Sequence, residues 1–119
     1  MNVNKEKLHV ISGLLRDLET PVFPYPVEPS HIRYVVSIML VGDGAASRTV
    51  DIYKIYPEEE VFEKKIPMVP IAPADMKMIP DKIDLENPVM VLEGGSNLAG
   101  VVNAGTGISI AVWYYDDIR

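Results

Sequence analysis

The stretch MVLEGGSNLAGVVNAGTGISIAVWYYDD, which runs from Met90 to Asp117, decides the fold of this chain. It contains three short apolar runs, which are separated by a Gly-Gly-Ser-Asn break and an Ala-Gly-Thr-Gly break. Glycine adopts the positive φ that tight hairpin turns require, and neither break carries the lysine of a phosphate-binding loop. We therefore interpret the stretch as the closing strands of a β-sandwich.

The last of these runs, residues 108–115, alternates in character and predicts a strand. The face that suits a core carries Ile108, Ile110, Val112 and Tyr114. The opposite face carries Ser109, Ala111, Trp113 and Tyr115. The large aromatics Trp113 and Tyr115 leave three interpretations open, namely a sugar-stacking platform, a subunit interface and a second buried face.

Two further alternating segments, His31–Val41 and Arg48–Tyr56, lie upstream and are joined by the turn sequence GDGAAS. β-Branched and aromatic residues dominate both segments, which predicts an antiparallel pair of strands. Residues 66–80 contain several prolines and predict two short edge strands around a corner, because proline cannot donate to a central ladder. One face of the first segment is expected to carry Ile32, Tyr34, Val36, Ile38 and Leu40.

The N-terminal region, residues 1–30, is expected to form an arm beside a β-sandwich domain of residues 31–119. Residues 5–18 place leucine and isoleucine at helical spacing, but a strand or an extended arm fits them as well. Residues 20–30 are proline-rich and predict an extended arm, a sheet edge or a surface loop. Phe23, Tyr25 and Val27 alternate within this segment, so we expect them to lie along another surface.

The spacing of turn signals predicts roughly seven to nine strands along the chain. The expected fold is an all-β antiparallel β-sandwich, jelly-roll-like, with an N-terminal arm or short helix. A parallel α/β fold is disfavoured because no helix alternates with the predicted strands. The chain has 119 residues, of which 48% are hydrophobic and 24% charged, and these values fit a single globular domain.

Charge and composition exclude several function classes. The net charge is −6 and the basic residues are scattered, so a nucleic-acid partner is not expected. No stretch resembles a signal peptide or a membrane span, which predicts a soluble protein without membrane contact. Cysteine is absent, and His9 and His31 are the only imidazoles. No combination of nucleophile and base is evident, so we expect no enzymatic activity, no metal site and no cofactor.

The order of elements resembles small β-sandwich domains in virion proteins of tailed bacteriophages, among them fibre, baseplate and head-decoration components. The similarity covers about residues 27–118 and lies in VEPSHIRYVVSIMLVGDGAASRTVDIYKI, IAPADMKMIP, VMVLEGGSNLAG and GISIAVWYYDDI. The resemblance implies a structural, oligomeric role, commonly trimeric. It implies no catalytic residues.

The leading hypothesis is a non-enzymatic structural virion protein that oligomerises, with a trimer favoured, and docks on a larger phage assembly as a head-decoration, tail or fibre component. Its expected location is the virion, and the host cytoplasm during assembly. The alternative is a carbohydrate-binding β-sandwich module that uses an aromatic platform. The expected interface residues are Phe23, Tyr25, Val27, Trp113 and Tyr115.

Overall fold

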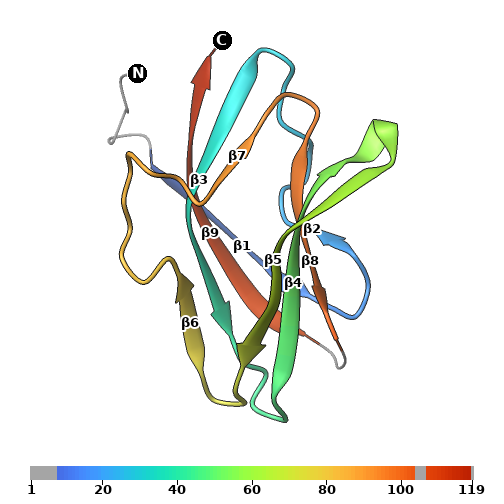
Figure 1. Cartoon of the computed structure of the whole chain (residues 1–119), viewed down its shortest axis with the longest axis vertical. Coiled ribbons are helices and arrows are strands. Elements are labelled where there is room, and N and C mark those ends of the chain that lie inside the picture. The colour runs from blue at the N-terminus through green and yellow to red at the C-terminus, as the bar shows by residue number, and fades with distance from the viewer. Residues whose placement is uncertain (1–7, 104–106, 119) are drawn as a thin grey trace.

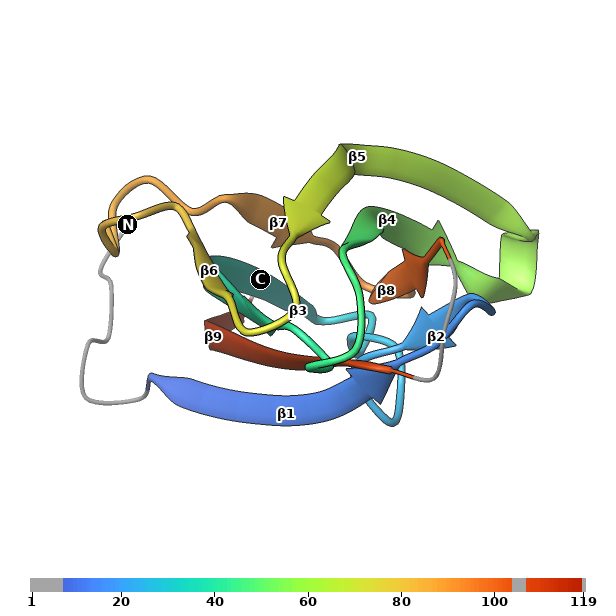
Figure 2. The same ribbon diagram turned by 90° about the horizontal axis from the view of Figure 1, so that it is seen from below.

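The computed structural model describes residues 8–103 and 107–118, which form two antiparallel β-sheets packed face to face. Figures 1 and 2 show the two layers, and they confirm the all-β sandwich predicted from the sequence. Sheet A contains, in spatial order, β1 (His9–Leu15), β9 (Ile108–Ile118), β3 (His31–Val41) and β6 (Met76–Ile79), while β7 (Met90–Leu92) also pairs with β3. Sheet B contains β2 (Thr20–Pro21), β8 (Asn97–Val102), β4 (Arg48–Tyr56) and β5 (Val61–Ile71). A short 3₁₀ helix, η2 (Pro57–Glu59), connects β4 to β5.

The stretch that begins at Met90 forms β7, β8 and β9, so its three apolar runs are all strands. No two of them are neighbours. β8 belongs to sheet B, and within sheet A β7 and β9 each pair with β3 and not with one another. β9 lies between β1 and β3 and pairs with both along most of its length. The predicted core face is confirmed for Ile108, Ile110 and Val112, whose side chains are buried between the sheets.

The core is built from the inward-facing residues of both sheets and from apolar side chains of the segment after β2. Leu98 and Ile52 of sheet B face this core and are fully buried. Gly100 allows Leu15, at the end of β1, to approach β8, since a Cβ atom at Gly100 would lie 2.5 Å from Leu15 Cδ1. This contact brings β1 of sheet A against β8 of sheet B at one edge of the sandwich.

The N-terminal residues do not form an arm outside the sandwich. β1 is an edge strand of sheet A and β2 pairs with β8 in sheet B, so residues 30 and 31 do not mark the boundary of the fold. The ambiguous segment is a strand over residues 9–15, and no helix forms there among the described residues. Residues 5–7 of this segment and residues 104–106 of the second glycine break lie outside the described residues.

The faces predicted for β3 are wrong in its first half. A register irregularity between Val35 and Ser37 inserts one extra residue, which reverses the alternation. Upstream of this β-bulge, Val35 faces the core with Tyr114, while Tyr34 lies on the outer face with Tyr115. The predicted inward direction holds for Ile38 and Leu40, which follow the bulge and are fully buried.

The proline-rich segment after β2 is fixed to sheet B by backbone and side-chain hydrogen bonds. The side-chain amide of Asn97 donates to the Phe23 carbonyl oxygen at 2.9 Å and accepts from the Phe23 N–H at 3.3 Å. The Val27 N–H donates to the Ser96 carbonyl oxygen at 2.9 Å. The segment is not a strand at residues 22–30, so the alternation expected of Phe23, Tyr25 and Val27 does not hold.

Candidate functional site

The structure separates the residues that the sequence grouped as an interface. Phe23 and Val27 are buried in the core of the chain itself, so neither side chain is available to a second subunit. Tyr25 points outward and is 78% exposed. Trp113 is partly exposed on the outer face of sheet A.

Tyr115 is covered by the chain's own loop between β6 and β7. Its side chain is only 2% exposed, stacks on Tyr34 with ring centroids 4.9 Å apart, and donates a hydrogen bond to the Leu85 carbonyl oxygen at 3.1 Å. Burial raises the pKa of the Tyr115 hydroxyl, with further contributions from Tyr34 and Asp117. Trp113 and Tyr115 therefore do not form a shared exposed platform.

The outer face of sheet A carries a broad surface without charge. Register pairing aligns its residues in rows that cross the sheet, such as Ser12, Ala111, Met39 and Met78, and Leu14, Ser109, Val41 and Met76. Leu14 is 52% exposed and Met76 is 59% exposed. Val10 and Trp113 continue the surface along β1 and β9. We call this surface the uncharged face: Val10, Ser12, Leu14, Met39, Val41, Met76, Met78, Ser109, Ala111 and Trp113.

A shallow hollow of about 440 Å³ lies in the uncharged face. Small residues such as Ser12, Ser109 and Ala111 line it together with the longer side chains of Leu14 and Met39. The outer face of an antiparallel sheet in a soluble protein is usually polar, whereas the uncharged face consists of apolar residues and serines. A surface of this composition is typical of a protein–protein contact.

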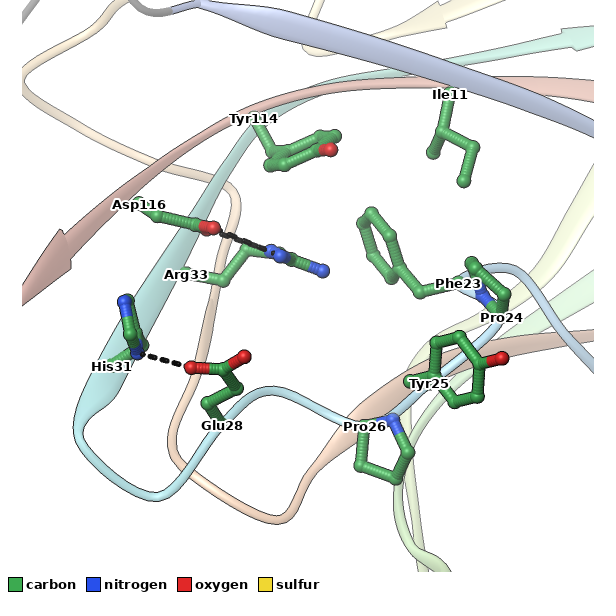
Figure 3. A pocket seen from close by; sticks show the side chains of 10 residues that line it. All are labelled: Ile11, Phe23, Pro24, Tyr25, Pro26, Glu28, His31, Arg33, Tyr114 and Asp116. Carbon is green, nitrogen blue, oxygen red and sulfur yellow. Dashed lines mark hydrogen bonds and ion pairs between the residues drawn. The ribbon is translucent and has the colours of Figure 1, made fainter.

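A second feature is an open pocket at the end of the sandwich where β3 begins and β9 ends. It encloses about 340 Å³, and Figure 3 shows its lining side chains. The apolar part comes from Ile11 of β1 and Tyr114 of β9, together with Phe23, Pro24, Tyr25 and Pro26 of the proline-rich segment. The polar part consists of Glu28, His31, Arg33 and Asp116. We call this feature the end pocket.

Arg33 is the central residue of the end pocket. Its Nε and Nη2 donate to the two carboxylate oxygens of Asp116 at 2.7 and 2.8 Å, and its guanidinium carbon lies 4.4 Å from the Phe23 ring centroid and 4.5 Å from that of Tyr114. Burial alone would lower the pKa of Arg33, but the hydrogen bonds and charge of Asp116 outweigh it and raise the pKa. The bidentate pair holds the guanidinium between two aromatic rings.

A second polar pair lies at the rim of the end pocket. His31 Nδ1 is 3.3 Å from a carboxylate oxygen of Glu28 and 3.1 Å from the Ser30 hydroxyl oxygen. The sequence placed His31 at the edge of an apolar run without indicating these partners. Arg33 and Asp116 were not recognised either, because the charged pair joins two strands that are far apart in sequence.

The remaining features indicate no further site. Within residues 8–103 and 107–118, no three His, Asp or Glu side chains gather as a set of metal ligands. The described part of the chain contains no helix that is long and apolar enough to span a membrane. Comparisons of the chain with protein-family models, with curated proteins and with solved structures give no match.

Proposed function

We propose that this chain is a non-enzymatic structural subunit that self-associates through the uncharged face of sheet A. The observation that carries the proposal is that this face spans four strands, contains no charged residue and exposes large apolar side chains such as Val10, Leu14 and Met76 in the isolated chain. Burial of such a surface against a second copy is favoured by the hydrophobic effect. Partly exposed methionine and tryptophan side chains suit this contact, because both are enriched at protein interfaces.

The geometry of the uncharged face is compatible with pairing of identical subunits. The hollow combines small residues with the longer side chains of Leu14 and Met39, so the face has an uneven relief that a second copy is able to complement. β1 is the edge of sheet A in the described structure, and its unpaired backbone groups offer further contacts at the margin of the same face.

The larger assembly is proposed to be a bacteriophage virion, in which the chain serves as a head-decoration, tail or fibre component. This part of the proposal rests on the resemblance of the strand and turn pattern of residues 27–118 to virion β-sandwich domains, and the same resemblance favours a trimer. The uncharged face supports the self-association that such a role requires. Localisation to the virion follows as part of the same proposal.

The experiment is sedimentation velocity of the full chain over a wide concentration range, with two variants matched for exposure. Leu14→Asp places a charge on the uncharged face, whereas Phe62→Asp places one on a side chain that is 51% exposed on the β4–β5 hairpin. We expect an oligomer for the native chain and for Phe62→Asp, and a folded monomer for Leu14→Asp. A native chain that remains monomeric at high concentration would rule the proposal out.

The alternative function, carbohydrate binding, is not supported at Trp113 and Tyr115, because Tyr115 is buried. The observation that favours it lies at the end pocket, where exposed aromatic and paired polar side chains meet in a cavity.

A further inference from the structure

We propose that the end pocket binds a neutral sugar residue of a glycan. The proposal deepens the alternative function by assigning it a site and a ligand class, and it does not depend on self-association through sheet A. Three properties of the pocket carry it, namely its aromatic surfaces, the neutralised Arg33–Asp116 pair and its size.

The aromatic surfaces are supplied by Tyr114 on the floor and Tyr25 at the rim. Tyr25 is 78% exposed and stands between Pro24 and Pro26, whose rings fix φ and limit the motion of the segment. The backbone around Tyr25 is therefore restrained, which lowers the entropic cost of ordering this segment on binding. The exposed Tyr25 ring offers a flat apolar surface for the C–H face of a sugar.

The Arg33–Asp116 pair at the centre of the end pocket favours a neutral ligand over a charged one. Arg33 is already neutralised by Asp116 through two hydrogen bonds. A phosphate or a carboxylate would compete with Asp116 for the guanidinium, and a cation would compete with Arg33 for Asp116. Adjacent hydroxyl groups, which both donate and accept, are able to contact the two members of a pair without separating them.

The free donors of Arg33 have the geometry that adjacent hydroxyls require. Asp116 occupies the Nε and Nη2 edge of the guanidinium, so Nη1 lies on the opposite edge. Figure 3 shows the guanidinium reaching from Asp116 toward the space in front of Phe23, with Glu28 on the same side of the pocket. Donors of Arg33 and acceptors of Glu28 thus border one space.

The volume of the end pocket limits the ligand to a small unit. About 340 Å³ is near the lower end of the range of small-molecule sites, which is about 300–1,000 Å³. One sugar ring fits a space of this size, and the open side leaves room for the rest of a glycan in solvent. We therefore expect recognition of a single terminal or branching residue.

The test is titration of the isotopically labelled full chain with glucose, galactose, mannose and N-acetylglucosamine, followed by NMR. Inorganic phosphate and tetramethylammonium serve as anionic and cationic probes. At least one neutral sugar is expected to give saturable shifts at the residues that line the end pocket. Tyr25→Ala, at an exposed position, is expected to weaken binding about fivefold to tenfold.

Phe62→Ala is the matched control, because Phe62 is an exposed aromatic residue on a different part of the chain and should leave sugar binding unchanged. Asp116→Asn is expected to weaken binding further while native shifts elsewhere report that the fold is retained. The proposal is overturned if no sugar gives saturable shifts, if only phosphate or tetramethylammonium binds, or if Tyr25→Ala and Phe62→Ala bind equally. Sedimentation velocity tests self-association and NMR tests sugar binding. A negative result in one experiment therefore leaves the other proposal standing.

Discussion

The outer faces of the two sheets differ in their content of charged residues. Sheet A presents the uncharged face, whereas sheet B presents charged residues that contact one another. On sheet B, Lys64 Nζ lies 3.6 Å from the Asp51 carboxylate and 5.6 Å from the centroid of the Tyr53 ring. Asp51 also accepts a hydrogen bond from the Met68 N–H at 2.7 Å. Sheet B is thus compatible with permanent contact with water, while sheet A is suited to being covered.

The two sheets share one core, yet their outer faces differ in charge. Burial of the inner faces stabilises the fold, and it constrains the outer faces only weakly. The outer residues of β1, β9, β3 and β6 are therefore free to serve another purpose.

The largest expected effect comes from placing the same charge on each outer face. Ala111 faces outward from β9, and Val101 faces outward from β8 opposite Asp51. Ala111→Arg is expected to weaken self-association about a hundredfold or more, because an unpaired charge would be buried at the contact. Val101→Arg should leave it unchanged. Sedimentation velocity measures both, and equal effects would abolish the distinction between the faces.

A smaller effect is expected from the charged pair that lies between the layers. Lys54 is buried and forms an ion pair with Glu93, which also accepts a hydrogen bond from the Tyr56 hydroxyl at 2.8 Å. Glu93→Gln leaves the Lys54 charge without its counterion. Because the Glu93 side chain is 38% exposed, we expect a loss of about 1–3 kcal/mol at neutral pH, measured by urea unfolding.

The same variant has a defined pH dependence. Burial alone would raise the pKa of Glu93, but Lys54 and Tyr56 outweigh it and lower the pKa below its ordinary value of 4.5. The stabilisation is therefore complete above pH 4.5 and is lost as the pH falls through the lower folded value. In Glu93→Gln the free energy of unfolding should not show this loss as the pH falls. Lys64→Gln, in the exposed pair on sheet B, is the control, and a similar loss for both variants would contradict the prediction.

The smallest expected effect is a gain in stability at the margin of the uncharged face. Ser37 pairs in register with Trp113, is fully buried, and its hydroxyl has no hydrogen-bond partner among the described residues. Ser37→Ala removes this buried hydroxyl and is expected to raise the free energy of unfolding by about 1 kcal/mol. Ser12→Ala, at an exposed serine of the same face, should change nothing. A destabilised Ser37→Ala would show that the hydroxyl is satisfied.

The sequence predicted the strands that carry a strong local pattern. The bounds of β3 and β4 agree with the segments expected from alternation, and so does the corner between β5 and β6. β1 remained ambiguous because residues four apart lie on the same side of both a helix and a strand. Ile11 and Leu15 have this spacing, and only pairing with β9 resolves the choice.

The candidate sites depend on information that is not local. The bulge at Val35–Ser37 reverses the direction of Tyr34, and no residue pattern around it signals the change. The Arg33–Asp116 pair and the rows of the uncharged face arise from register between distant strands. Phe23 and Val27 were misjudged as exposed because an irregular segment does not alternate.

The central position of β9 in sheet A has a consequence for the order of synthesis. Residues 9–15 emerge from the ribosome long before residues 108–118, yet β1 pairs in its sheet only with β9 among the described strands, whereas β3 also pairs with the earlier strands β6 and β7. During translation β1 and one edge of β3 therefore remain unpaired until β9 is made, and long-range pairing of this kind is slow. The uncharged face and the end pocket both include residues of β9, so nascent chains can neither assemble nor bind a ligand there before β9 is made.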